Sequence, residues 1–241
     1  MDHVLAAESI TKRFGRREVV RSAGCWVESG KITVLLGRNG CGKTTLSRIA
    51  VGLLRADSGV IIVGRHRYLR PRLSQLAGQA VFFLCQDPWL SPAHSIACHF
   101  DALAYHLPDV AIEGAIARTG IAALLAQKPS RLSPGERRCV ELGLALARRP
   151  RCLVADEPFL GLAPEQVELF ASVFRELAHT GTGLWVTGHE VETLLPLADT
   201  IVWMTAGTTH HLGAPRMALA HDQFVREYVG MHRHGLVQGA S

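Results

Sequence analysis

A nine-residue stretch near the start of the chain restricts the folds that this sequence can adopt. Residues 37–45 read GRNGCGKTT and match the pattern G-x-x-x-x-G-K-[ST], which forms a loop around phosphate groups. An apolar, β-rich run at 31–36 precedes the loop, and residues 45–54 follow it with a helical apolar pattern. Strand, loop and helix therefore occur in the order that a phosphate-binding loop requires.

The chemistry of this loop predicts that the chain binds a nucleoside triphosphate. We expect Gly37, Gly40 and Gly42 to take positive φ, which turns successive N–H groups inward around an anion at the start of the next helix. Lys43 would reach the β- and γ-phosphates, and Thr44 would ligate Mg²⁺. The other loop residues expected to contact the nucleotide are Arg38, Asn39, Cys41 and Thr45. The alternative, a fortuitous glycine-rich turn, is disfavoured by the flanking strand and helix.

Length and composition agree with one large domain that needs no disulfide bond or structural metal ion to fold. A chain of this length buries roughly 70 to 75% of its unfolded surface. The six cysteines lie far apart and form no C-x-x-C pair, which argues against a disulfide framework and a zinc site. No apolar stretch approaches the roughly 18 residues of a membrane span, and no signal-peptide pattern opens the sequence. We therefore expect a soluble, cytosolic protein.

One segment of the chain is rich in basic residues. The net charge of +5 is spread along the chain except at 65–72, which read RHRYLRPR. Such a cluster is usually a solvated face, and the alternative is a contact with a partner or with lipid headgroups. The cluster is weak evidence for nucleic acid, and we expect no nucleic-acid partner.

Beyond the loop, strands and helices alternate along the chain. Short apolar runs predict buried strands at 59–64, 80–85, 152–155, 183–187 and 200–204. Residues 91–131 break the alternation and form a predicted helical insert. Its helix-favouring segments are 101–105, 110–119 and 121–126. The predicted organisation is a single domain over 1–230, with a core at about 1–90 and 132–230 and a loose tail at 231–241.

Two adjacent carboxylates follow the apolar run at 152–155. Asp156 and Glu157 would lie at the C-terminal edge of a parallel sheet. There Asp156 would hold Mg²⁺ through its water shell, and Glu157, pointing the other way along the strand, would polarise an attacking water. The alternative is a pair that merely caps the strand in solvent, which the phosphate loop in the same chain disfavours.

The segment 131–136, which reads RLSPGE, is a third candidate site. Ser133 and Glu136 form a capping box, and Pro134 occupies the first helical turn, where its missing N–H does no harm. A helical apolar pattern continues to Ala147. A helix N-terminus also binds anions, so local physics leaves open a plain cap and a second phosphate contact.

Three motifs, GRNGCGKTT, LSPGE and LVADEP, together resemble those of the ATP-binding-cassette (ABC) ATPase family, over about residues 4–230. The LSPGE motif resembles the family's signature, which other phosphate-loop proteins lack. The resemblance implies an α/β fold: a P-loop NTPase core with a mostly parallel sheet, an antiparallel β subdomain near the N-terminus and an inserted α-helical subdomain. It also implies hydrolysis of ATP, with Mg²⁺ as cofactor, to drive transport.

Three more site residues follow from the resemblance alone. Phe14 matches the aromatic that stacks on adenine, Gln86 the glutamine that senses Mg²⁺ and the membrane subunit, and His189 the histidine that contacts the γ-phosphate. Taken singly, they would be a core residue, a loop residue and a structural histidine. The implied catalytic residues are Lys43, Gln86, Glu157 and His189, and the implied Mg²⁺ ligands are Thr44, Gln86 and Asp156.

The resemblance also implies a head-to-tail pair of cassettes, as a homodimer or heterodimer, with two ATP molecules between them. Ser133 and Gly135 of one subunit would complete the site at the other subunit's phosphate loop. Separate transmembrane permease subunits would sit near Gln86 and the helical insert, at the cytoplasmic face of the inner membrane. Residues 135–142, 156–164 and 224–230 look like the branch serving lipopolysaccharide export and branched-chain amino-acid uptake, with lipopolysaccharide export favoured.

Three departures from the family pattern bear on these expectations. Ala163 replaces an aspartate that bridges the two subunits, Pro134 replaces a glycine, and Cys98-His99 replaces a Glu-Asn pair. The first motivates an alternative, a non-hydrolysing regulatory cassette in a heterodimer. A soluble cassette acting on ribosomes or DNA is a further alternative, although such proteins usually carry two cassettes or a coiled-coil insert.

The cysteine within the phosphate loop raises a separate hypothesis. The loop N–H groups and Lys43 would lower the pKa of the Cys41 thiol and make it sensitive to alkylation, with protection by ATP. The alternative is an inert small residue.

Overall fold

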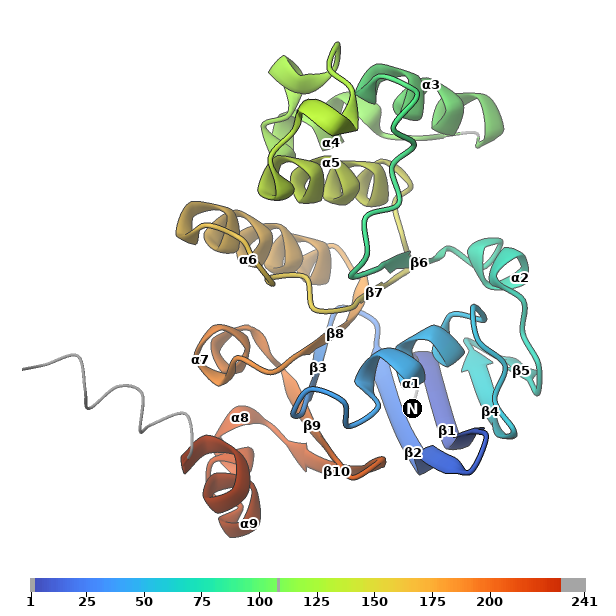
Figure 1. Cartoon of the computed structure of the whole chain (residues 1–241), viewed down its shortest axis with the longest axis vertical. Helices are drawn as coiled ribbons and strands as arrows, with labels where there is room; N and C mark the ends of the chain where they lie inside the picture. Colours follow the sequence, from blue (N-terminus) through green and yellow to red (C-terminus); the bar gives the residue numbers. More distant parts are fainter. Residues whose placement is uncertain (1–2, 108, 231–241) are drawn as a thin grey trace, which may run out of the picture.

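Two β-sheets meet at the centre of the molecule, and the phosphate loop follows an inner strand of the larger one (Figure 1). The computed structural model describes residues 3–107 and 109–230. The larger sheet has the strand order β10-β9-β3-β8-β7-β6. Its strands are β3 (Ile32–Leu36), β6 (Val81–Leu84), β7 (Cys152–Ala155), β8 (Gly183–Gly188), β9 (Thr200–Thr205) and β10 (Thr208–Gly213). All pairings are parallel except that of β9 with β10, so the carboxyl ends of the parallel strands meet at one edge.

The strands predicted from apolar runs are confirmed, with one difference in burial. The runs at 31–36, 80–85, 152–155, 183–187 and 200–204 all form strands of the larger sheet. The run at 59–64, predicted as another buried strand, instead forms β4 (Ser58–Val63) in the second sheet and is only half-buried. Only Ile61 and Val63 are buried along it, because alternate side chains of an antiparallel strand face solvent.

The second sheet is antiparallel, as the resemblance implied, and has the strand order β2-β1-β4-β5. Its other strands are β1 (His3–Phe14), β2 (Arg17–Glu28) and β5 (His66–Tyr68). Within the basic segment that includes β5, Arg65, Arg67, Arg70 and Arg72 are all exposed, as a solvated face requires. Arg67 lies 3.7 Å from Glu8 on β1.

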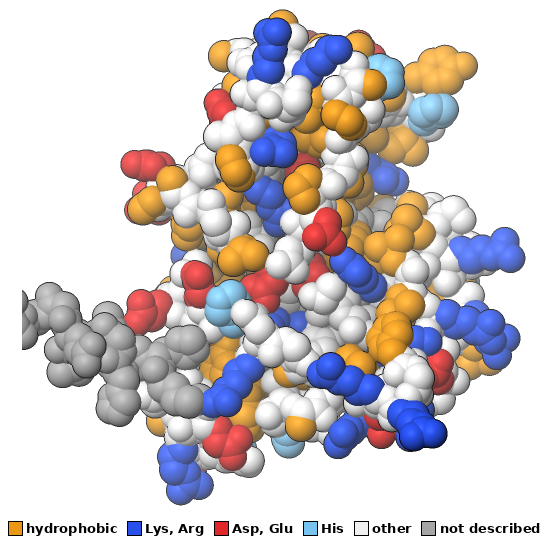
Figure 2. All heavy atoms as spheres, viewed as in Figure 1, with side chains coloured by type: hydrophobic (Ala, Val, Ile, Leu, Met, Phe, Trp, Pro, Cys, Tyr) orange, Lys and Arg blue, Asp and Glu red, His pale blue; other side chains and the backbone are white. Residues whose placement is uncertain are grey.

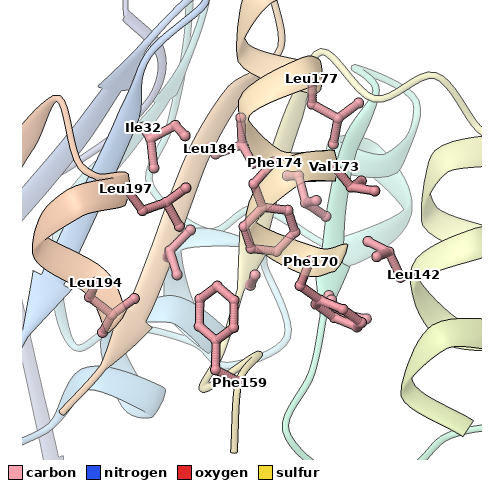
Figure 3. Close-up of a cluster of buried hydrophobic side chains, with 14 of the residues drawn as sticks. Ile32, Leu142, Phe159, Phe170, Val173, Phe174, Leu177, Leu184, Leu194 and Leu197 are labelled. Carbon is pink, nitrogen blue, oxygen red and sulfur yellow. The ribbon is translucent and has the colours of Figure 1, made fainter. Parts of the chain in front are cut away.

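Side chains on the two faces of the larger sheet belong to two hydrophobic cores. On one face, Val34 and Leu184 join the phenylalanines of Figure 3. The rings of Phe159, Phe170 and Phe174 pack edge to face with centroids 5.9 to 6.4 Å apart. The opposite face packs against the antiparallel sheet and the helix after the phosphate loop, through Leu35, Leu46, Trp185, Met204 and Val20. The loop therefore emerges from a strand that is buried on both faces.

Helices flank both sheets (Figure 1). They are α1 (Lys43–Ala50), α2 (Leu73–Ala77), α3 (Ile96–His106), α4 (Ile112–Thr119), α5 (Pro134–Ala147), α6 (Pro164–His179), α7 (Val191–Leu194), α8 (Pro215–Ala218) and α9 (Asp222–Phe224). A single π-helical turn, Val225–Val229, follows α9. The described part of 91–131 contains α3, α4 and two short 3₁₀ turns and no strand. The exact division into core and insert stays a prediction, and the tail predicted at 231–241 lies outside the described residues.

Across residues 3–107 and 109–230, no helix combines the length and the apolar character that crossing a bilayer requires.

Candidate functional site

The phosphate loop joins β3 to α1 and turns through two glycines. Gly40 and Gly42 have φ of 78° and 115°, as predicted. The prediction for Gly37 was wrong, because this glycine is not among the residues with positive φ. It is needed for space instead, since a Cβ there would lie 2.5 Å from the Met204 carbonyl oxygen and 2.7 Å from Cys41 Sγ. Met204 belongs to β9, so this contact depends on the tertiary fold.

The side chain of Lys43 is buried within the loop. Its Nζ donates to the carbonyl oxygens of Gly37 at 2.8 Å and Arg38 at 3.4 Å. It also forms a buried ion pair with Glu157 Oε1 at 3.1 Å. These three oxygens hold the ammonium group where oxygens of a phosphate would compete for it.

Glu157 joins two of the predicted catalytic residues. Its second carboxylate oxygen, Oε2, lies 2.9 Å from His189 Nδ1, so the carboxylate lies between Lys43 and His189. The residue has φ of 48°, a conformation that a non-glycine residue rarely takes and that is concentrated at functional sites. Its N–H donates to the Thr187 hydroxyl at 3.0 Å, which supports this backbone conformation.

Asp156 is fully buried at the end of β7. Its Oδ1 accepts a hydrogen bond from the Thr187 hydroxyl at 2.6 Å. Among the described residues, Oδ2 is buried and has no hydrogen-bond partner. Burial raises the pKa of Asp156, and the hydroxyls of Thr187 and Thr44 oppose this rise. A buried carboxylate oxygen with unfilled lone pairs, near a threonine hydroxyl, fits the oxygen ligands that Mg²⁺ prefers.

A cavity of about 440 Å³ connects Lys43, Glu157 and His189, and Asp156 is not among the residues that line it. The predicted residues that line it are Phe14, Asn39, Gly40, Gly42, Lys43, Thr44, Thr45, Gln86, Glu157 and His189. Phe14 is 50% exposed, so the alternative of a core residue is wrong. Figure 2 shows acidic side chains and a histidine gathered between α7 and α1 on this face. Residues far apart in the sequence therefore enclose one polar cavity.

The cavity also contains residues that sequence reasoning missed. Arg17, Val19 and Leu160 line it as well. Arg17 and Val19 come from β2, which lies beside the loop only because the antiparallel sheet packs there. Leu160 follows the carboxylate pair, and no sequence signal separated it from a core leucine.

Gln86 is held in place by two charged residues of α5 that were not predicted. The Arg138 guanidinium donates to the Cys85 carbonyl oxygen at 2.6 Å and pairs with Glu141 at 3.0 Å. Glu141 in turn accepts from the Trp89 N–H at 3.3 Å. The main chain is thus tied to α5 on both sides of Gln86, by an ion pair that is itself buried.

The predicted capping box at the start of α5 is confirmed. The Glu136 N–H donates to Ser133 Oγ at 3.2 Å, and the Ser133 N–H donates to Glu136 Oε2 at 2.8 Å. Ser133 is exposed and does not line the cavity. Gly135 is buried, and a Cβ there would collide with the Gln166 side chain. A single chain therefore does not bring Ser133 and Gly135 to the phosphate loop.

The predicted lowering of the Cys41 thiol pKa was wrong. Burial raises the pKa of the Cys41 thiol, while Lys43 and the loop N–H groups only partly oppose this effect. The side chain packs against the main chain at Gly37, which favours the alternative of an inert small residue.

Comparisons with known proteins identify the family of the chain. A family model described as ABC transporter matches residues 21–160. The lipopolysaccharide export system ATP-binding protein LptB of Acidithiobacillus ferridurans is 32% identical over 95% of this chain and 98% of that protein. LptB of Haemophilus influenzae is 30% identical over 94% of this chain and 97% of that protein.

Solved structures show the same fold. The crystal structure of an ATP-binding cassette of an ABC transporter in its ADP conformation matches with a TM-score of 0.83 at 22% identity, covering 95% of this chain and all of that one. A dimeric cassette in a post-hydrolysis state, bound to ADP and Pi, matches with a TM-score of 0.76 at 17% identity, covering 86% of this chain and 98% of that one.

Proposed function

Because the chain belongs to the ABC transporter family as an ATP-binding subunit, we propose that it drives transport by hydrolysing ATP in the cavity between the phosphate loop and His189. The observation that carries this proposal is the position of the Glu157 carboxylate, 3.1 Å from Lys43 Nζ and 2.9 Å from His189 Nδ1. A carboxylate at the end of a phosphate-binding cavity, beside a histidine, is suited to accept a proton from an attacking water.

The triphosphate would be bound by the N–H groups of the loop and by Lys43. When phosphate oxygens take the Lys43 ammonium group, Glu157 loses one of its two partners and becomes available to a water molecule. The water oxygen attacks the γ-phosphorus, its proton passes to Glu157, and the bond to the ADP oxygen breaks. His189 would contact the γ-phosphate as this charge develops.

The residues beside the proposed site of water attack fit Mg²⁺. Asp156, Thr44 and Gln86 would hold it, and the unpartnered Oδ2 of Asp156 supports the assignment. When bound, Mg²⁺ would neutralise charge on the β- and γ-phosphate oxygens.

A second cassette would complete the site. Ser133 is exposed at the start of α5, outside the cavity of its own chain, which suits a contact with the ATP of a partner. Ala163 offers no side-chain cap at the start of α6, and its N–H donates to Gln166 Oε1 at 3.1 Å instead. Gln166 also lies against Gly135, so the first turns of α5 and α6 are in contact. We expect this surface to face the partner without the usual aspartate.

Separate membrane subunits would dock in an apolar groove beside the cavity. The groove has a volume of about 650 Å³ and includes Leu53, Leu73, Phe82, Trp89 and Leu103 in its lining. Trp89 is 42% exposed there, and Figure 2 shows hydrophobic side chains on the surface beside α2. Two residues separate Trp89 from Gln86, so one segment contacts both the groove and the cavity. We propose an apolar helix of a membrane subunit as the occupant of this groove.

The transported substrate is proposed from the relatives. Two of them are named as ATP-binding proteins of lipopolysaccharide export, and each aligns over more than nine-tenths of this chain. We therefore propose export of a lipopolysaccharide or related lipid, at the cytoplasmic face of the inner membrane, with branched-chain amino-acid uptake as the alternative.

Replacing the proposed general base tests hydrolysis directly. Glu157→Gln keeps the size and a hydrogen-bonding group but removes the base, so we expect ATP turnover to fall by about 10²- to 10⁴-fold. ATP binding should remain, because the loop and Lys43 are unchanged. Turnover is measured by phosphate release and binding by calorimetry. Full activity in this variant would contradict the proposed mechanism, and a wild type that binds ATP without turnover would favour the regulatory alternative.

A further inference from the structure

A buried tyrosine near the C-terminus contacts the main chain of His189 without lining the ATP cavity. Tyr228 is 2% exposed, and its hydroxyl donates to the main-chain carbonyl oxygen of His189 at 2.8 Å. Burial raises the pKa of the phenol further above its ordinary value, so the group stays protonated and remains a donor. The Gly37 peptide lies close enough to oppose this rise.

The tyrosine ring is held by a stack of aromatic side chains. The Phe224 ring is stacked on it, with centroids 5.5 Å apart at 22°, and Trp203 of β9 packs against Phe224 with centroids 5.8 Å apart. The neighbouring Glu227 carbonyl oxygen accepts from Arg38 of the phosphate loop at 3.3 Å. The π-helical turn is thus anchored both to the sheet and to the loop, and it presents the Tyr228 hydroxyl to the main chain of His189.

The contact acts on the residue that places the catalytic imidazole. The Gly188 carbonyl oxygen accepts from the Gly37 N–H at 3.2 Å, and the His189 carbonyl oxygen accepts from Tyr228. Two successive carbonyls around the His189 Cα are therefore fixed, one by the phosphate loop and one by the C-terminal turn. With the backbone held, the imidazole needs only its own side-chain torsions to reach Glu157 Oε2 at 2.9 Å.

We propose that Tyr228 is a positioning residue for ATP hydrolysis, which holds the main chain at His189 so that the imidazole meets Glu157 and the γ-phosphate. This proposal rests on the hydrolysis proposed above. Tyr228 is not among the residues that line the proposed ATP cavity, and its effect on turnover would pass through His189.

The test is Tyr228→Phe, which removes the hydroxyl and leaves the aromatic stack. We expect kcat to fall about three- to tenfold, the scale of one lost hydrogen bond, while the KM for ATP changes less than about twofold, because the loop residues are untouched. Tyr68→Phe is the matched control, since Tyr68 lies on β5 and its hydroxyl makes no hydrogen bond within the described part of the chain. An unchanged kcat in Tyr228→Phe, or an equal fall in the control, would overturn the proposal.

A double-mutant cycle with His189→Ala separates positioning from general loss of structure. If Tyr228 acts through the imidazole, adding Tyr228→Phe to His189→Ala produces no further fall in kcat. A second fall of the same size as in the wild-type background would show that the hydroxyl acts elsewhere and would refute the proposal.

Hydrogen exchange tests the same contact without turnover. Amides of 187–191 should exchange several-fold faster in Tyr228→Phe than in the wild type or in Tyr68→Phe, because local opening of this segment costs less free energy. Unchanged exchange would refute the proposal even if the wild type proved inactive. An inactive wild type with the expected exchange would instead count against the proposed hydrolysis.

Discussion

The two halves of the proposed nucleotide site differ in how this chain holds them. The loop half consists of the phosphate loop with Asp156, Glu157 and His189, and its charged groups are joined by buried contacts. Lys43 Nζ, the Glu157 carboxylate and His189 Nδ1 form one chain of ion pairs and hydrogen bonds. These residues come from three parallel strands that end at the same edge of the sheet.

The signature half consists of Ser133 and Gly135 at the start of α5, and its contacts are local. Ser133 is exposed, and within the described residues it bonds to Glu136 and Arg137, three and four positions away. The Ser133 N–H lowers the pKa of the Glu136 carboxyl by stabilising its charged form, as expected for a capping box at the surface. The signature half thus satisfies the helix end but reaches no phosphate site in its own chain.

The difference indicates where each half gains its function. We expect the loop half to bind phosphate in a single chain, because one fold brings its groups together. The signature half already forms a complete helix cap, and its proposed second role, a contact with the nucleotide of a partner cassette, requires another surface. Perturbing the first should therefore change binding by one chain, and perturbing the second should change only what two chains do together.

The largest expected effect is on the loop half. Lys43→Ala removes the buried ammonium group, and we expect ATP affinity to fall by about 100-fold, the scale of charge-assisted hydrogen bonds to phosphate. Calorimetry on the single chain measures this change. Lys31→Ala is the control, because Lys31 is exposed and pairs with Asp199 at 3.3 Å. Equal affinities of Lys43→Ala and the wild type would remove the distinction between the two halves.

A smaller effect is expected on the signature half. Ser133→Ala should leave ATP affinity of the single chain unchanged but reduce ATP-dependent dimerisation and turnover by roughly tenfold, because the partner site loses one hydroxyl. The variant also loses a helix cap, which costs about 1 kcal/mol of stability.

The matched control for that variant is Ser95→Ala. In the wild type, the Ser95 hydroxyl accepts from the Cys98 N–H at 3.3 Å at the start of α3. The control variant loses an equivalent cap, so its stability should fall by a similar amount while dimerisation, followed by sedimentation, stays normal. If both variants lose dimerisation equally, the signature half acts only as a cap.

The smallest expected effect is a gain of stability in the loop half. Without Mg²⁺, Asp156→Asn should be more stable than the wild type at pH 8 by on the order of 1 kcal/mol, because the buried Oδ2 is left without a partner. Burial raises the pKa of Asp156, so the folded protein holds this proton more tightly than the unfolded chain. The proton on Asp156 therefore stabilises the folded wild type at low pH. This contribution is lost as the pH rises from the ordinary pKa near ~3.9 through the raised pKa.

Thermal unfolding in EDTA between pH 4 and pH 8 measures how the stability of each protein depends on pH. The difference in stability between Asp156→Asn and the wild type should become smaller toward low pH. Asp57→Asn should show the opposite trend. The Lys12 side chain and the Arg13 N–H lower the pKa of Asp57, so the wild type loses that contribution as the pH falls. If the difference in thermal stability between Asp156→Asn and the wild type does not change with pH, burial does not destabilise the charged Asp156 carboxylate.

Much of the site was predictable because its signals are local. The phosphate loop, the carboxylate pair and the capping box each lie within ten residues, and the structure forms the expected strand ends and helix starts there. The misses share another cause. Tyr228, Arg17 and Arg138 act on residues at least 30 positions away in the sequence or come from the other sheet, so no local pattern identified them.

Taken alone, the sequence determined the chemistry of the loop, the order of strands and helices and the family, because these depend on residue types at short, regular spacing. Tertiary structure decided that Gly37 is needed for space beside Met204, that burial raises the pKa of Cys41, and that Ser133 lies outside its own chain's cavity. Burial, charge pairing and close approach depend on which distant segments pack together, and spacing along the chain does not specify that packing.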